Sequence, residues 1–225
     1  MWRNSNSGWQ KMNLLDLPPR IVALARGLGG LDSAGIRSSY LDAIGDAMLT
    51  YLSGDESLTR FRNSYKRAVL EHFDSMFYSG YVAGGGQISQ MSEDDRGWLL
   101  AKINAELGYV DMLFQSLKAL RKSQDTPQNL AGIAMQHAGM YARALDSVYA
   151  EGKARGLSGK EMYTLLGSDG KESCPECQRY KGQRHPIKWW RERGLIPSPG
   201  NHNYTCGNWV CDHHLYDDNM EPLAG

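Results

Sequence analysis

The chain has 225 residues, 41% of them hydrophobic and 22% charged, which is enough apolar content to build a hydrophobic core and excludes disorder along the whole length. Its 25 Lys and Arg residues balance its 25 Asp and Glu residues, so no net charge draws the protein toward nucleic acid or an anionic membrane. No apolar run approaches the roughly 18 residues of a membrane span, and the first residues lack the apolar core of a secretion signal, so we expect a soluble protein made inside the cell.

The first part of the chain carries the pattern of amphipathic helices. Residues 1–18 are predicted to form an N-terminal arm, and residues 19–165 a helical domain. From about Pro19 to Arg155 the apolar positions recur every three or four residues, which places them on one helical face. The predicted helices cover about 20–27, 36–52, 58–77, 93–122 and 127–148.

Capping residues mark several of these helix ends. Ser92 is a suitable N-cap, and the acidic residues 93–95 place negative charge in the first turn of the helix that follows. Together with nearby Glu106 they could suggest a cation site, but capping and compensation of the helix dipole explain this acidic group better. Pro127 follows a capping residue at the start of the next helix, where its missing N–H is not needed.

Long helices joined by short connectors normally fold back on one another, so we predict a mainly α fold with an antiparallel helical bundle. Gly84–Gly86 interrupt the pattern in a connector of about 83–91, because glycine destabilises a helix interior by about 1 kcal/mol. A phosphate-binding loop needs a following Lys and Ser or Thr, whereas Gln87, Ile88 and Ser89 follow here. We therefore interpret this segment as a flexible connector.

The composition changes after Leu157, and we predict a separate C-terminal module over residues 166–225. Gly, Pro, Trp, Cys and His replace the helical pattern, and turn signals occur at 168–170, 197–200 and 206–208. About 60 residues with many loops bury little apolar surface, so this small loop-rich module needs a cross-link such as a bound metal ion or disulfides.

All four cysteines and four of the six histidines lie in this module. Cys174 and Cys177 form a C-x-x-C pair, and Cys206 and Cys211 are followed closely by His213. Thiolate and imidazole are the ligands that zinc prefers, and four of them complete its tetrahedral shell, so we predict a structural zinc ion held by four of these five side chains. Disulfides, buried thiols and a redox pair remain alternatives, because the spacing between the two cysteine pairs is not a common zinc-finger length.

The aromatic and basic residues of the module have a structural and a nucleic-acid interpretation. Trp189, Trp190 and Trp209 are expected to pack the small core around the metal. Basic residues interleave with these rings, which is also the pattern of a surface that stacks bases and neutralises phosphates. The candidate DNA contacts are Lys181, Arg184, Lys188 and Arg191.

A zinc-supported nuclease or DNA-binding protein is the alternative function. Asp212, His213 and His214 supply the acid and the histidine that such a nuclease needs. They follow the last cysteine, however, whereas His-metal-finger nucleases carry these residues between two C-x-x-C pairs. We therefore predict a non-enzymatic protein with no catalytic residue.

An ordered set of Cys, Gly, Pro and Trp residues runs through the chain between Tyr141 and Leu215. It comprises Tyr149-Ala150-Glu151-Gly152, Leu165-Leu166-Gly167, Cys174-Pro175-Glu176-Cys177, Tyr180, Gly182, Pro186-Ile187, Trp189 or Trp190, Gly194, Pro197, Pro199-Gly200, Cys206-Gly207, Cys211, His213 and Leu215. This set resembles the C-terminal cysteine-rich region of the minor head, or head-morphogenesis, proteins of tailed bacteriophages, a group that includes the Mu-type minor head proteins.

The resemblance implies a virion protein of the phage head, present in few copies and needed for head assembly or genome packaging. It implies contacts with portal or major capsid subunits, an oligomer in the virion, and a location in the host cytoplasm during assembly. In a filled head, the basic and aromatic residues of the module are the candidates for weak contact with packaged DNA. The resemblance implies no enzymatic activity. His213 stands where the family pattern has its last cysteine, and since histidine can replace a thiolate on zinc, this departure favours a metal over disulfides.

Overall fold

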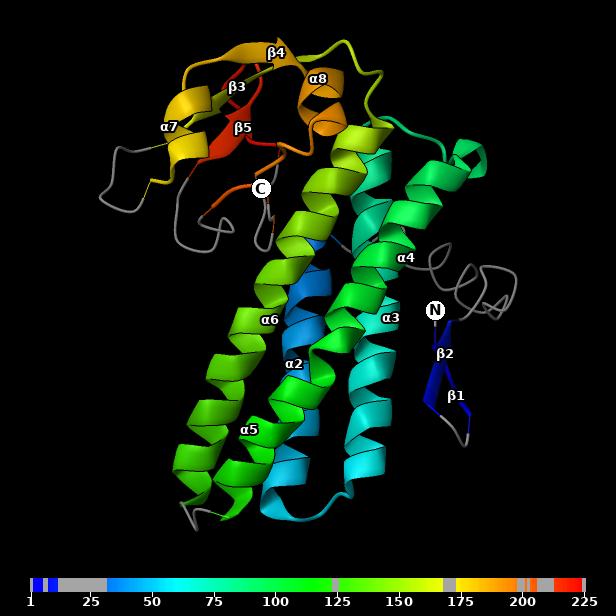
Figure 1. The fold of residues 1–225 in the computed structure, drawn as a ribbon, viewed down its shortest axis with the longest axis vertical. Helices are drawn as coiled ribbons and strands as arrows, with labels where there is room; N and C mark the ends of the chain where they lie inside the picture. The colour runs from blue at the N-terminus through cyan, green and yellow to red at the C-terminus, as the bar shows by residue number, and fades with distance from the viewer. Residues whose placement is uncertain are drawn as a thin grey trace. The chain divides into compact units, whose positions relative to one another are not determined.

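The computed structural model describes residues 2–5, 8–11, 32–122, 126–167, 173–197, 201, 203–205 and 213–223. Over these residues the fold is mainly helical, which confirms the predicted fold class at that level (Figure 1). Contacts divide the chain into two compact units, of which the first unit comprises residues 1–75 and 92–142, and the second unit residues 76–91 and 143–225. No helix in the described ranges combines the length and the apolar character that a membrane crossing requires.

A short hairpin lies within the predicted N-terminal arm. β1 (Trp2–Ser5) pairs with β2 (Gly8–Lys11) in an antiparallel register that sets Trp2 opposite Lys11. The sequence did not reveal these strands, because four residues are too few for apolar alternation to show. The helix predicted over about 20–27 lies outside the described residues.

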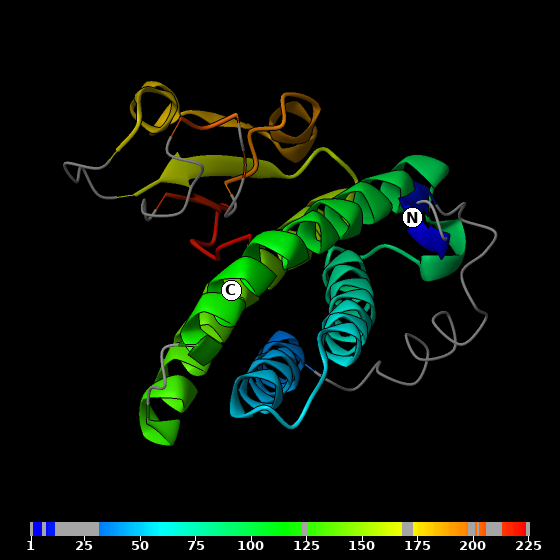
Figure 2. The same cartoon turned by 60° about the horizontal axis from the view of Figure 1, so that its bottom comes forward.

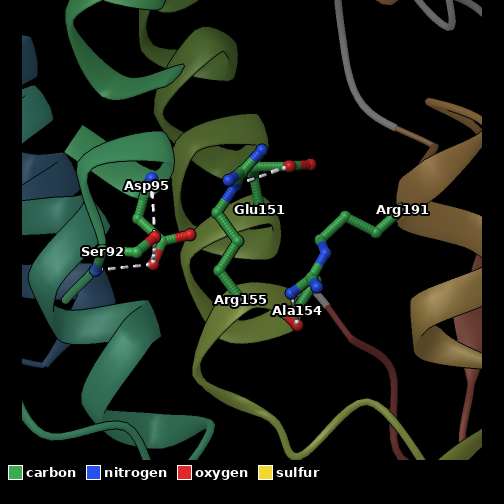
Figure 3. Close-up of polar contacts among 6 residues, drawn as sticks. All are labelled: Ser92, Asp95, Glu151, Ala154, Arg155 and Arg191. Carbon is green, nitrogen blue, oxygen red and sulfur yellow. Dashed lines mark hydrogen bonds and ion pairs between the residues drawn. The ribbon is translucent and has the colours of Figure 1, made fainter. Parts of the chain in front are cut away.

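Capping side chains mark the starts of α2 and α4, and α3 and α6 continue into the second unit. At the start of α2, the Asp32 carboxylate accepts a hydrogen bond of 2.7 Å from the Gly35 N–H. At the start of α4, Ser92 and Asp95 form a capping box, in which each side chain accepts a hydrogen bond from the other residue's N–H (Figure 3). The bounds are α2 Ser33–Ser53, α3 Leu58–Ala83, α4 Glu93–Gly108, α5 Val110–Lys122 and α6 Pro127–Gly156.

The single helix predicted over 93–122 is wrong in one respect, because two helices occupy this range. α4 ends at Gly108, and the Tyr109 N–H bonds to the carbonyl of Glu106, three residues back rather than four, at 3.0 Å. Gly108 weakens the helix at this point, and the tighter turn then separates α4 from α5. Apolar periodicity continues across the break, so periodicity alone could not reveal it.

The second unit contains a three-stranded antiparallel sheet in the order β4-β3-β5. Helices α7 and α8 flank the sheet in both views (Figures 1 and 2). The sequence predicted a loop-rich module here, because strands of three to five residues leave too little alternation to detect. The elements are the short 3-10 turn η2 (Ile88–Gln90), β3 (Met162–Leu166), α7 (Pro175–Tyr180), β4 (Arg184–Pro186), α8 (Ile187–Glu192) and β5 (His214–Tyr216).

The predicted limit between helical domain and module, at residues 165 and 166, falls inside β3. The second unit also takes in the end of α6 and residues 76–91, which the prediction assigned to the helical domain. The physical reason is packing, because Ala150 and Ala154 of α6 are buried in the same core as the sheet. Other members of this core are Tyr163, Leu165, Cys174, Cys177, Ile187, Trp190, Leu195, Ile196, Tyr204, Leu215 and Leu223.

Within the second unit, the ends of α3 and α6 approach each other at their backbones. A Cβ built at Gly80, Gly84, Gly152 or Gly156 would overlap a carbonyl oxygen of the opposite helix. The four-residue spacing places each pair of glycines on one helix face, which lets the two axes come closer than side chains would allow. These four residues are called the glycine contact below. The carbonyl groups that these four glycines approach belong, in the same order, to Tyr149, Lys153, Phe77 and Tyr81. The residue numbers of the contacts rise together along the two helices, so the helices run in the same direction (Figure 1).

We expect Gly152→Ala to lower the free energy of unfolding by about 1–3 kcal/mol, because its methyl group must push the carbonyl of Phe77 away. This loss is expected even though alanine gains about 1 kcal/mol over glycine inside a helix. Urea unfolding followed by circular dichroism measures the change.

Gly132 and Gly139 of the same helix are the matched controls, since a Cβ at either position meets nothing within 4 Å. We expect Gly132→Ala and Gly139→Ala to stabilise the protein by up to about 1 kcal/mol. Equal effects of alanine at positions 152 and 132 would show that the glycine contact does not constrain the helices.

Candidate functional site

The C-x-x-C pair lies at the start of α7, in the core of the second unit. Cys174 is the residue before the helix, Pro175 is its first residue, and Cys177 lies one turn later. Both cysteines are buried, with exposed fractions of 6% and 0%. The Gly182 N–H, just beyond α7, donates a hydrogen bond of 2.8 Å to the carbonyl of Leu165, which fixes this helix against β3.

Glu176, between the two cysteines, holds a distant part of the chain. Its carboxylate accepts hydrogen bonds from the backbone N–H and the hydroxyl of Thr205, at 2.9 and 3.0 Å. The Thr205 N–H, its own backbone N–H and the Cys174 thiol lower the pKa of Glu176 to about 2. This residue therefore carries a full negative charge at neutral pH, and it keeps residue 205 beside the cysteine pair. We call this contact the Glu176–Thr205 tether.

His213 lies just before β5 and is fully buried. A Cβ built at Gly167 would lie 2.6 Å from the Cγ atom of His213, so the imidazole lies directly against the Gly167 backbone. The pairing of Leu166 with His214 at the ends of β3 and β5 sets this position. Only glycine at position 167 leaves room for the ring.

Three of the five predicted zinc ligands, Cys174, Cys177 and His213, thus fall in the described part of the second unit. Cys206 and Cys211 lie outside the described residues. Among the residues that the structure describes, no three His, Cys, Asp or Glu side chains are grouped as ligands of one ion. The zinc site stays a prediction.

Trp190 and Trp189 differ in their surroundings. Trp190 is fully buried and donates its indole N–H to the carbonyl of Tyr163 at 3.1 Å. The ring of Trp189 stacks on His185 at 3.8 Å, and the guanidinium carbon of Arg193 lies 4.2 Å from the same ring centroid. Two planar groups this close to one centroid must occupy opposite faces, so the Trp189 ring has no open face for a nucleic-acid base. Trp209 lies outside the described residues.

The proposed DNA-contacting cations engage groups of the protein itself. Both nitrogens of one edge of Arg184 bind the Asp218 carboxylate, at 3.0 and 2.6 Å. Lys188 lies 3.7 Å from Glu192, and Arg191 donates to the carbonyl of Ala154 at 3.5 Å (Figure 3). These contacts favour a structural role over phosphate binding for Arg184, Lys188 and Arg191; the fourth candidate, Lys181, is half-buried.

The nuclease alternative rests on residues with different environments. His213 has no exposed surface, His214 is exposed on β5, and Asp212 lies outside the described residues. A histidine that activates water must reach solvent or substrate, so His214 is the member of this set placed to do so.

A second polar cluster, in the first unit, was missed by the sequence analysis. Glu106, near the end of α4, has a buried side chain that accepts a hydrogen bond of 3.1 Å from the Tyr65 hydroxyl. Tyr40 and Tyr141 also lie close enough for the charge of Glu106 to raise their pKa values, although burial is the larger cause. Position 106 falls on the inner face of α4, and that periodicity was the available signal.

Burial raises the pKa of Glu106 to about 7, while the Tyr65 hydrogen bond and the charge of Lys102 act in the opposite direction. Burial likewise raises the pKa of Asp74, on α3, to about 7. Two carboxyl groups of the first unit therefore gain or lose a proton near neutral pH.

No protein-family model matches this chain, and neither a search of curated proteins nor a search of solved structures finds a similar protein.

We expect the stability of the wild-type protein to fall as the pH rises from about 4.5 to beyond 7. The Glu106 carboxyl has a pKa of about 7 in the folded state against 4.5 ordinarily, so between these values the folded state binds more protons than the unfolded state. Glu106→Gln removes this contribution and should raise the free energy of unfolding at pH 8 by up to about 3 kcal/mol, with little change at pH 4.5. Urea unfolding at both pH values measures it.

Glu93→Gln, on the exposed first turn of α4, is the matched control and should leave the pH dependence unchanged. Asp74 contributes equally to the wild type and to both variants, so it cancels from the comparison. A Glu106→Gln variant with the wild-type slope between pH 4.5 and 8 would contradict the assignment.

Proposed function

We propose that this chain is a non-enzymatic structural and assembly protein of a tailed-phage head, whose C-terminal module is held by a structural zinc ion. In this role the protein acts through its contacts with portal or capsid subunits and catalyses no reaction. The sequence resemblance between Tyr141 and Leu215 is the origin of the proposal.

The observation that supports it is the position of the residues that carry the resemblance. Cys174, Cys177, Ile187, Trp190 and Leu215 are all members of one buried core. Side chains that a reaction uses must reach a substrate, whereas these side chains pack against one another. A motif whose residues are buried in the core of a small unit favours a structural role over a catalytic one.

Exposed methionines on the first unit suit the contacts that such a role needs. Met112 on α5 and Met135 and Met140 on α6 have exposed fractions of 61%, 51% and 57%. Unbranched thioether side chains adapt to the shape of a partner surface. We propose that this part of the protein contributes to binding of capsid or portal subunits.

The described residues fit the zinc part of the proposal in two ways. Two thiols lie one helical turn apart in a core that shields them from water, as structural zinc sites require. The Glu176–Thr205 tether holds residue 205 beside this pair, and the next residue in the chain is Cys206. The zinc would be held by Cys174, Cys177, Cys206 and either Cys211 or His213, and it would stabilise the fold without taking part in a reaction.

Elemental analysis of protein purified without chelator or reductant should find about one zinc ion per chain, together with four free thiols after denaturation with chelator. Cys174→Ser should lose the metal and unfold the second unit. Glu176→Gln keeps all five candidate ligands but weakens the tether, so we expect it to bind zinc about 10-fold more weakly. Two disulfides and no metal in the wild type would overturn the zinc proposal and leave the head role standing.

The head role has its own test in the phage whose genome encodes this chain. Mass spectrometry of purified particles should find the protein in the head, and disruption of its gene should give particles that lack DNA or fail to assemble. His214→Ala should assemble normally. Infectious particles without the protein would overturn the proposal, as would metal-dependent DNA cleavage by the purified chain that His214→Ala abolishes with its folding intact.

A further inference from the structure

The first unit contains a pocket of about 380 Å³ beside the break between α4 and α5. Ligand pockets in proteins commonly begin at about 300 Å³, and an apolar cavity of about 150 Å³ already admits benzene. This pocket therefore has room for a molecule of two or three rings. Its wall consists of one face of α3, the end of α4 and the start of α5. The lining residues are Arg62, Tyr65, Lys66, Asn104, Leu107, Gly108, Val110 and Asp111.

Most of the surface that this wall presents to the pocket is apolar. Leu107 and Val110 supply aliphatic side chains, and Tyr65 supplies its ring, while its hydroxyl donates to the buried Glu106. Lys66 is half-buried, and its four-carbon stem adds aliphatic surface. Covering such a surface is favourable for an apolar ligand, and the Tyr65 ring suits an aromatic one, which can pack against it edge to face.

Several polar groups of the wall are turned away from the pocket or bound to one another. The Nε atom of Arg62 and the Oδ1 atom of Asn104 have almost no accessible surface, so a molecule in the pocket does not reach them. The Nη2 atom of Arg62 pairs with Asp111, and the two charges compensate each other. An ionised ligand would give up its hydration for few polar contacts, which favours an uncharged one.

Gly108, at the end of α4, leaves one position of the wall without a side chain. This residue is exposed, and a Cβ built there meets nothing within 4 Å. Since Gly108 lines the pocket, a large side chain at this position would extend into free space. The pocket can therefore be filled by substitution without displacing a packed neighbour.

We propose that this pocket binds a small, uncharged aromatic molecule of two or three rings. The ligand is held by burial of its apolar surface against Tyr65, Leu107 and Val110. All the lining residues belong to the first unit, so the inference is independent of the zinc module and of the role in a phage head.

Fluorescence titration of the full chain with N-phenyl-1-naphthylamine tests the proposal, because the emission of this uncharged probe rises when it leaves water for an apolar site. We expect a saturable rise that fits one molecule per chain, with a Kd below about 50 μM. The matched probe is 8-anilinonaphthalene-1-sulfonate, which has the same rings and adds one negative charge. We expect it to bind at least about 10-fold more weakly, because its sulfonate must lose hydration.

Variants assign the binding to this pocket. Gly108→Phe should fill the space and weaken binding at least about 10-fold, and Leu107→Asn, which places a polar group in the wall, at least about five-fold. Gly132→Phe is the matched control, since it adds the same ring to an exposed helical glycine outside the pocket whose Cβ also meets nothing within 4 Å. We expect it to leave the affinity unchanged.

Circular dichroism checks the folding of each variant, and the comparison of the two probes on the unaltered protein decides the question if a pocket variant does not fold. The proposal is overturned if the uncharged probe gives no saturable rise. It is also overturned if the sulfonate binds as tightly as the uncharged probe, or if folded Gly108→Phe keeps the wild-type affinity.

Discussion

The second unit depends on the backbone contact between α3 and α6 at the four glycines. Because main chain meets main chain there, α6 lies where its opposite face, with Ala150 and Ala154, can enter the core beside the sheet. The same helix then receives the end of the described chain, since the Lys153 ammonium donates to the carbonyl of Pro222 at 3.2 Å. Packing on α6 thus stabilises the second unit in addition to any stabilisation that a metal provides.

Buried polar groups are satisfied to different degrees in this fold. In the second unit the buried indole of Trp190 donates its N–H to the carbonyl of Tyr163. In the first unit the buried carboxyl group of Glu106 accepts a hydrogen bond of 3.1 Å from the hydroxyl of Tyr65. A protein interior tolerates such a group only at a cost in stability, so one region of this fold is less optimised than its surroundings.

Helices could be predicted from this sequence because their signals are local. Ser92 caps its helix through contacts within a few residues, whereas the strands of the second unit pair residues about 20 and 50 positions apart in the chain. The cysteine pair was visible as a motif, but its link to Thr205 spans 29 residues of sequence. The buried state of Glu106 was hidden for a different reason: it lies on the inner face of α4, but an acidic side chain does not count toward an apolar stripe.

The second unit is discontinuous, with residues 76–91 joined to residues 143–223 across a long intervening stretch of chain. During synthesis on the ribosome, the bare glycine face of α3 therefore leaves the exit tunnel well before its partner on α6 exists. Bringing the two together must close a loop, which carries an entropy cost that grows only slowly with its length. The first unit, which supplies that loop, is thus in a position to act as a folding template that brings the two halves of the second unit together.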